Sequence, residues 1–272
     1  MRYATVRLAG ATRAVRIDND AAVVLDAADV GELLARDGGL DGANQTGQRL
    51  SLDDLDYATL LPKPEKVLCV GLNYAAHITE MGRELPIYPT LFAKYPSALI
   101  GAYDDIVLPG ESDAMDWEAE LGIVVGAAVR RATPEQARAA IAGYTVVNDI
   151  SARDWQYRTT QWLQGKNFEA TTPVGPWLVS GNDDPAFDLR CDVDGDLVQQ
   201  SNTADLVFDP VALVQYASTM FTLAPGDLIA SGTPGGVGHA RKPPRYLHDG
   251  SVMTTRIGGV GECRNVCRAE KQ

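Results

Sequence analysis

The chain has 272 residues, of which 45% are hydrophobic and 22% are charged, a balance that is ordinary for a globular protein. Its 24 basic and 36 acidic residues give a net charge of −12, and no cluster of Lys or Arg interrupts that acidity. We therefore expect no nucleic-acid partner and no anionic membrane partner. The chain also shows no apolar stretch of membrane-spanning length and no signal-peptide core, which predicts a cytoplasmic protein.

Cysteine and histidine usage limits the kinds of metal site. Cys263 and Cys267 are the only close pair of cysteines, and no histidine lies near enough in sequence to suggest zinc. Reduced thiols are the expectation for this chain. With only three histidines in the sequence, any metal would have to be held by oxygen ligands.

The first 60 residues predict a small unit of strands and one helix. The segments RYATVRLAG, TRAVRID and AAVVLD alternate as short strands do, and DVGELLARD follows as a helix before the polar loop GGLDGANQTG. In LLPKPEKVLCVG, Pro62 and Pro64 forbid a continuous helix or central strand, which indicates a linker. We expect a small N-terminal α/β domain at residues 1–62 and a second domain at residues 63–272.

The second domain is expected to be rich in short strands and turns, with two clear helices. TPEQARAAIAG predicts a helix with Thr133 as N-cap, Pro134 at its first position, Gln136 completing a capping box and Gly143 as its stop. DPVALVQYASTM predicts another helix, opened by an Asp-Pro pair. Strands and helices do not alternate regularly, so a doubly wound parallel sheet is not favoured.

Two glutamates stand next to an apolar run in DAMDWEAELGIVVG. The run from Leu121 to Val125 predicts a buried strand closed by Gly126, and on a strand Glu118 and Glu120 face the same side. Two like charges beside a hydrophobic run are costly without a compensating positive charge. A divalent cation, a pair of basic side chains or solvent exposure at a strand end would each resolve the conflict, and this stretch alone favours exposure.

Other polar residues follow predicted strands. Asp149 comes just after the strand in YTVVNDISARDWQ, where it could be a helix N-cap or a third carboxylate for a Mg²⁺ or Mn²⁺ site. His77 and Glu80 are three residues apart after the strand KVLCV, a spacing that suits an imidazole oriented by a carboxylate but also an incidental surface pair. Lys166 is either a solvated loop lysine or a cation in a pocket. In ASGTPGGVG, backbone amides and the Thr233 hydroxyl could bind a carboxylate.

Taken in order, these motifs resemble the fumarylacetoacetate hydrolase family. The matching segments are GLNYAAH, DWEAELGIVVG, GYTVVNDISARDWQ, GKNFEATTPVGP, SNTADLVFDP, TLAPGDLIASGTPGGVG and DGSVMTTRIGGVGECRN, which run from about Val67 to Arg264. The resemblance implies an α+β, mostly β fold: a mixed β-sheet sandwich or roll with few helices, with a small N-terminal α/β appendage. It also implies a homodimer.

The resemblance also assigns candidate roles. The implied metal ligands are Glu118, Glu120 and Asp149; the implied catalytic residues are the His77–Glu80 dyad and Lys166; and the implied substrate-binding residues are Arg153, Gln156 and Thr233. The segment carrying the dyad often orders as a lid in the family. The far end of the substrate is expected to meet RELPIYPTLFAKYP, and in HARKPPRYLHDG the basic residues could be solvated charges or could guide an anion inward.

These assignments imply an enzyme that depends on Mg²⁺ or Mn²⁺. The first expectation is hydrolysis of a carbon–carbon bond in a small acylpyruvate or 1,3-diketone acid, through a metal-stabilised enolate and a water activated by His77 and Glu80. The alternative is a lyase on the same scaffold, acting as an oxaloacetate-type decarboxylase, a 2-oxo-enoate hydratase or a tautomerase, because the same enolate serves each reaction. A non-catalytic, metal-stabilised binding protein is a distant alternative.

Overall fold

The computed structural model describes residues 1–80, 82–181 and 186–271. Its strands are β1 (Arg2–Leu8), β2 (Ala11–Ile17), β3 (Ala22–Leu25), β4 (Gln45–Leu50), β5 (Asp56–Tyr57), β6 (Val67–Gly71), β7 (Thr90–Lys94), β8 (Leu99–Ile100), β9 (Ile106–Leu108), β10 (Met115–Asp116), β11 (Ala119–Val125), β12 (Ile141–Asn148), β13 (Ser151–Ala152), β14 (Thr172–Ser180), β15 (Asp188–Val193), β16 (Asp196–Asn202), β17 (Leu228–Ala230), β18 (Val252–Ile257) and β19 (Gly261–Ala269). Its α-helices are α1 (Val30–Ala35), α2 (Ala75–Glu80), α3 (Pro134–Ala140), α4 (Arg153–Gln156), α5 (Leu163–Lys166) and α6 (Pro210–Met220).

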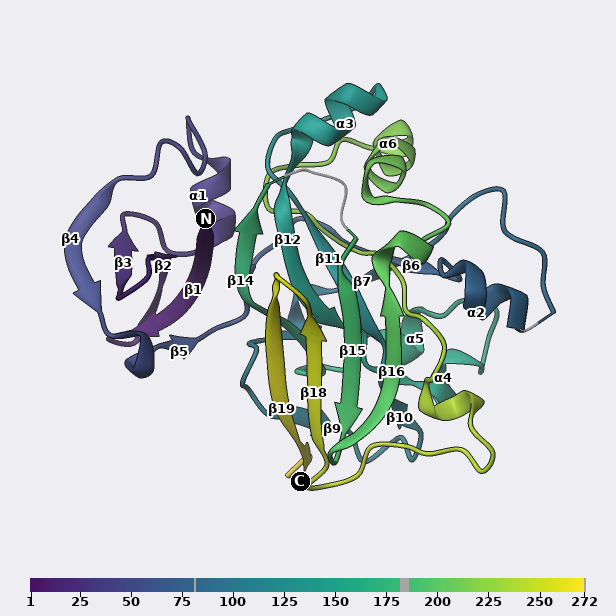
Figure 1. The fold of residues 1–272 in the computed structure, drawn as a ribbon. Coiled ribbons are helices and arrows are strands. Elements are labelled where there is room, and N and C mark those ends of the chain that lie inside the picture. The colour runs from purple at the N-terminus through teal and green to yellow at the C-terminus, as the bar shows by residue number, and fades with distance from the viewer. Residues whose placement is uncertain (81, 182–185, 272) are drawn as a thin grey trace.

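Two mixed sheets dominate the fold (Figure 1). The larger has the strand order β4-β3-β2-β1-β14-β12-β11-β17-β6-β7, with β5 paired to β1 and β8 paired to β14. The smaller has the order β16-β15-β18-β19-β9, and β10 pairs separately with β13. Most pairs are antiparallel, but β17 and β6 are parallel, as are β14 and β8 and β19 and β9. The prediction of a mostly β fold built from mixed sheets is confirmed.

The main hydrophobic core contains residues of both sheets. Leu121 and Ile123 of β11 share it with Cys191 of β15 and Met253 of β18. Val124, which points to the opposite face of β11, belongs to a second core that also contains residues of α1. Because β11 is buried on both faces, its sequence is a continuous apolar run rather than an alternating one.

The N-terminal segment contains the predicted strands and helix, which form β1, β2, β3 and α1. These elements, drawn in purple in Figure 1, extend the large sheet, because Arg2 and Tyr3 of β1 pair with Val179 and Leu178 of β14. The second half of the expected linker is strand β6, which pairs in parallel with β17. The proline residues precede that strand, so they do not interrupt its ladder. The domain boundary between residues 62 and 63 stays a prediction.

The capping box of α3 is confirmed, but its predicted stop is wrong. Thr133 Oγ1 accepts a hydrogen bond from the Gln136 amide, and the Thr133 amide donates one to the Gln136 side-chain oxygen. The helix ends at Ala140, and the chain passes directly into β12, so Gly143 lies within a strand. There a Cβ would stand 2.0 Å from the Val179 carbonyl oxygen of β14. Gly143 therefore permits a close backbone approach rather than ending a helix.

Three further expectations concern the start of α6, the state of the cysteines and membrane-spanning helices. Asp209 caps α6 by accepting a hydrogen bond from the Ala212 amide, as predicted from the Asp-Pro pair. The four cysteines are buried and none is in a disulfide. Among the described residues, no helix has the length and apolar character needed to cross a membrane.

Candidate active site

A cavity of about 320 Å³ collects most of the predicted site residues. Those that line it are His77, Glu118, Glu120, Arg153, Gln156, Lys166 and Thr233. Asp149 lies fully buried behind this wall, and Glu80 is exposed on the same short helix as His77. The structure thus brings together segments that are far apart in sequence.

The residues from Asp116 to Glu120 explain how charged groups can precede a core strand. Asp116, Glu118 and Glu120 alternate with Trp117 and Ala119, which belong to the main hydrophobic core. In an extended chain this alternation directs the three carboxylates to the opposite side from the core. All three are buried, so simple solvent exposure is excluded. Asp116 was not selected from the sequence, although its spacing from Glu118 repeats that of the glutamate pair.

Asp149 joins the glutamates because β11 and β12 are antiparallel neighbours. Ala119 pairs with Asn148 in the ladder, and the Asp149 amide donates to the Glu118 carbonyl at 2.8 Å. One carboxylate oxygen from each of Glu118, Glu120 and Asp149 lies within 4.8 Å of the others. Carboxylate oxygens are the donors that Mg²⁺ and Mn²⁺ prefer, so this set fits such a cation chemically.

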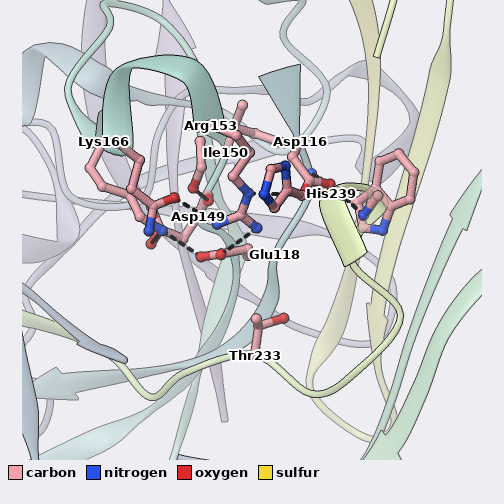
Figure 2. Close-up of polar contacts among 12 residues, drawn as sticks. Asp116, Glu118, Asp149, Ile150, Arg153, Lys166, Thr233 and His239 are labelled. Carbon is pink, nitrogen blue, oxygen red and sulfur yellow. Dashed lines mark hydrogen bonds and ion pairs between the residues drawn. The ribbon is translucent and has the colours of Figure 1, made fainter. Parts of the chain in front are cut away.

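Lys166 lies between two of these carboxylates. Its Nζ donates to Glu118 Oε2 at 2.5 Å and to Asp149 Oδ2 at 2.7 Å, as Figure 2 shows. Burial alone would lower the pKa of Lys166, but the carboxylates Asp149 and Glu118 outweigh it and raise that pKa above its usual value. Lys166 is therefore a buried ammonium at the end of α5, and the solvated-loop alternative is excluded.

Lys94 is a second buried lysine that sequence reasoning missed. It ends β7, and its Nζ donates to Asp149 Oδ1 at 2.7 Å and to the Ile150 carbonyl at 3.0 Å. Burial alone would raise the pKa of Asp149, but Lys166 and Lys94 hold it well below its usual range. In the sequence, Lys94 is a single charged residue that directly follows the segment TLFA. It lies in the stretch that was expected only to face the far end of the substrate.

Glu120 differs from the other carboxylates of the cluster in its partners. Among the described residues, no basic side chain forms a salt bridge with it, and its Oε2 accepts a hydrogen bond from the Gly232 amide at 2.8 Å. Burial raises the pKa of Glu120 well above its usual value, and Asp149 and Glu118 raise it further. A divalent cation would remove this conflict, so the arrangement around Glu120 agrees with the donor set in favouring a metal site.

Arg153 connects the carboxylate cluster to other residues that line the cavity. On α4, its guanidinium donates to Asp116 Oδ2 at 2.8 Å and to Gln156 Oε1 at 2.8 Å, and pairs with Glu118 at 2.6 Å. Figure 2 shows Arg153 between Asp116 and Glu118. Asp116 also accepts from the His239 amide at 3.0 Å, so one carboxylate anchors both α4 and the loop that follows Thr233. Arg153 and Gln156 thus brace the site as well as line it.

His77 and Glu80 lie on α2, so their spacing of three residues places them near one face of a helix. Both face Gly235, where a Cβ would stand 3.1 Å from His77 Nδ1 and 3.5 Å from Glu80 Oε2. Burial lowers the pKa of His77 from its usual 6.5, and Arg83 lowers it further, while Glu80 and Glu118 oppose the shift. The neutral imidazole therefore predominates at pH 7, which is the form that accepts a proton.

The glycine-rich loop after β17 supplies contacts to the carboxylate cluster. Gly232 has φ +99°, and a Cβ there would stand 2.9 Å from the Val70 carbonyl oxygen, so glycine lets its amide approach Glu120. Thr233 donates its hydroxyl proton to the Ala119 carbonyl at 2.9 Å and accepts from Gln199. Binding of a substrate carboxylate by Thr233 would replace the bond to Ala119.

The basic residues of HARKPPRYLHDG mostly hold their own loop. Arg241 donates to the carbonyls of Val198 at 3.0 Å and Gly236 at 3.2 Å, and Arg245 pairs with Asp196 at 2.9 Å. Their charges are therefore used within the protein rather than directed at an incoming anion. Lys242 is exposed.

Comparison with known proteins identifies the family. A family profile described as "Fumarylacetoacetate (FAA) hydrolase C-terminal" matches residues 66–268. The chain belongs to the fumarylacetoacetate hydrolase family. The predicted resemblance is confirmed, and the family match begins at Lys66, within the expected linker.

Relatives within the fumarylacetoacetate hydrolase family differ in their named reactions. A mitochondrial oxaloacetate tautomerase of Xenopus laevis is 42% identical over 221 residues, which span 79% of this chain and 69% of that protein. The structure of a fumarylacetoacetate hydrolase from Exiguobacterium antarcticum has a TM-score of 0.87 and 34% identity, and covers 99% of this chain and 100% of that one. A 5-carboxymethyl-2-hydroxymuconate delta-isomerase from Mycobacterium smegmatis has a TM-score of 0.84 and 32% identity, with the same coverage.

Proposed function

We propose that this protein catalyses the keto–enol interconversion of a small 2-oxo acid and requires Mg²⁺ or Mn²⁺. The observation that carries the proposal is the convergence of Glu118, Glu120 and Asp149 beside the buried ammonium of Lys166, in a cavity that His77 also lines. The names of two relatives, a tautomerase and an isomerase, support a proton shift as the reaction. When bound by the three carboxylates, the cation would supply Lewis acidity toward the 2-oxo oxygen.

The chain's own residues would divide the remaining work. Lys166 offers a positive charge where negative charge develops on the substrate oxygen, and it needs no reorganisation because its position is fixed by two carboxylates. Arg153 and Gln156 hold the wall in place, and Thr233 binds the substrate carboxylate in exchange for the Ala119 carbonyl.

His77 is the proposed proton acceptor. In the neutral form it takes a proton from C3 of the acid, and the resulting imidazolium gives that proton to the 2-oxo oxygen to complete the enol. Glu80, on the same helix, would orient the imidazole when substrate is bound. Reversal of the same two proton transfers returns the keto form, so the reaction consumes no water.

The test is the rate at which the enol form of oxaloacetate loses its ultraviolet absorbance, measured with and without Mg²⁺. We expect a protein-dependent acceleration that EDTA removes and Mg²⁺ or Mn²⁺ restores. Chromatography of the products shows whether oxaloacetate is only tautomerised or also loses carbon dioxide. Wild-type protein that leaves the spontaneous rate unchanged at every metal concentration would contradict the proposal and favour the non-catalytic binding protein.

Hydrolysis of acylpyruvates, the reaction that the motifs first suggested, is the second candidate. The observation that favours it is the neutral His77 in the same cavity, since that imidazole could equally deprotonate a water for attack on a distal carbonyl. Cleavage would release a carboxylic acid and pyruvate, which chromatography separates from tautomerisation. Pyruvate formation from acetylpyruvate at a rate comparable to oxaloacetate tautomerisation would favour the hydrolase.

The assembly and compartment also stay predictions. We expect a homodimer, which light scattering of the purified chain tests directly. The cytoplasm remains the expected compartment, although the Xenopus laevis relative is named as mitochondrial.

A further inference from the structure

Of the three Lys and Arg side chains that line the cavity, Arg83 is the one that lacks a carboxylate partner among the described residues. Arg153 is paired with Asp116 and Glu118, and Lys166 is paired with Glu118 and Asp149. The side chain of Arg83 makes no hydrogen bond or ion pair in the described part of the chain, although it lines the same cavity. Its charge is therefore available to a ligand, whereas the other two charges are already compensated.

Arg83 is placed close to the proposed base. It follows α2, and its backbone amide donates to the Ile78 carbonyl at 3.2 Å, which holds the turn at the end of that helix. The positive charge of Arg83 acts on His77 strongly enough to contribute to the lowered pKa of that imidazole. His77 and Arg83 thus both line the cavity and come from one short segment, which the amide–carbonyl bond from Arg83 to Ile78 holds together.

This placement has a consequence for the substrate. If His77 acts at C3 of a 2-oxo acid, then the group attached to C3 lies beside His77, which is the region where Arg83 contributes its charge. A carboxylate attached at C3 would therefore meet an unpaired guanidinium. A methyl or alkyl group at the same place would leave that charge without a partner.

The inner end of the cavity cannot provide this second charge. There, in the described part of the chain, the four carboxylates of Asp116, Glu118, Glu120 and Asp149 are accompanied by three buried cations, those of Lys94, Arg153 and Lys166. A bound divalent cation would leave an excess of about one positive charge, which one substrate carboxylate compensates. A second carboxylate needs a cation elsewhere.

We infer that Arg83 binds the distal carboxylate of the substrate, so that the site selects 2-oxo dicarboxylic acids over monocarboxylic ones. This inference rests on the proposed function, because it takes His77 to act at C3. Arginine suits the role, since its planar fork can donate two parallel hydrogen bonds to one carboxylate. Because Arg83 is exposed, solvent weakens the interaction, and we expect a selectivity on the order of tenfold rather than a thousandfold.

The experiment compares oxaloacetate with its 4-methyl ester, whose distal group is uncharged, and refers each rate to the spontaneous enolisation of the same compound, because the ester also acidifies C3. Wild-type protein should tautomerise oxaloacetate with a kcat/KM about tenfold above that for the ester. Arg83→Gln should lose about tenfold on oxaloacetate, mainly through KM, and less than about twofold on the ester. Arg83→Lys should fall between the two, because it keeps the charge but loses the fork. Arg13→Gln, a change at an exposed arginine of β2 outside the cavity, is the matched control and should change neither substrate.

Two results would overturn the inference. Equal losses on both substrates, with a shifted pH profile, would show that Arg83 acts through His77 rather than on the distal carboxylate. Unchanged kinetics of Arg83→Gln on both substrates would show that it has no role in recognition, while wild-type turnover would leave the proposed function standing.

A binding measurement separates this inference from the proposed function. Calorimetry in Mg²⁺ buffer compares malate with 2-hydroxybutanoate, which carries a methyl group in place of the distal carboxylate. If the wild-type protein turns over neither oxaloacetate nor the ester, the proposed function fails. Tighter binding of malate that Arg83→Gln abolishes would still support the distal contact, and equal affinity for both acids would reject it.

Discussion

The two sides of the cavity are built in different ways. At the inner end, Lys94, Asp149 and Lys166 are buried and joined by ion pairs of 2.7 Å. Lys94 ends the edge strand β7, Asp149 directly follows β12, and Lys166 ends helix α5. On the α2 side, His77 is half-buried and Glu80 is exposed, on a helix of six residues. The inner charges are therefore part of what holds the fold together, while the proposed base can be changed with little structural cost.

The largest expected effect is removal of the cation or of one of its ligands. Glu120→Ala should abolish Mn²⁺ binding and all turnover, because Glu120 is the carboxylate that the protein itself leaves uncompensated. The variant should still fold, because the substitution removes a buried carboxylate that has no charged partner among the described residues. Calorimetric titration with Mn²⁺ and a thermal melt measure the two outcomes. Wild-type Mn²⁺ affinity in this variant would remove Glu120 from the metal site.

The second-largest expected effect is on stability, and it distinguishes the inner end of the cavity from the α2 side. Lys94→Met should lower the free energy of unfolding by ~3 kcal/mol or more, because it leaves Asp149 Oδ1 buried without its partner. Urea denaturation measures this change. Lys63→Met, at an exposed position, is the control and should change stability by less than about 0.5 kcal/mol. Similar values for the two variants would mean that the inner charges do not stabilise the fold.

His77→Ala should show the opposite pattern. We expect a loss of ~10² to 10⁴ in kcat for proton transfer or hydrolysis, the usual contribution of a general base. The free energy of unfolding should change by less than about 1 kcal/mol, because the side chain is only half-buried. Steady-state kinetics and urea denaturation on the same preparation compare the two. A stability loss as large as that of Lys94→Met would erase the distinction between the two sides.

The smallest expected effect is the pH dependence of the wild-type protein. Because burial lowers the pKa of His77 from 6.5, its neutral form should remain dominant as pH falls from 8 to about 6.5. The kcat/KM should therefore keep more than half of its plateau value down to pH 6.5 and should fall as pH drops through the lowered pKa, where the imidazole gains a proton. An acid limb centred above pH 6.5 would contradict the assignment of His77 as the base.

The sequence predicted the parts of this molecule that depend on local patterns. The strands of the N-terminal segment, the capping box of α3 and the N-cap of α6 follow from neighbouring residues, and all are present. The position of Gly143 could not be interpreted locally, because the reason for glycine there is the Val179 carbonyl of another strand. A helix stop and a close strand contact look the same in one sequence.

In the candidate site, too, the sequence did not reveal contacts between distant segments. The motif order identified the residues that line the cavity, but it gave no partner for Asp149 beyond a cation. Lys94 became visible only when β7 was placed beside β6, because its contact to Asp149 joins residues 55 positions apart. Asp116 was missed for a related reason: its role is to anchor Arg153 and the His239 amide, both from distant segments.

The pairing of β1 with β14 has a practical consequence for anyone who shortens the chain to the family-matching region. Without residues 1–62, the edge of β14 beside Leu178 would lose its neighbouring strand, and the core shared with α1 would expose Val124, Val147 and Val174. An open edge next to an apolar face invites sheet-to-sheet association between copies. Such a fragment should form aggregates at concentrations where the full chain stays dispersed, even though every proposed active-site residue is still present.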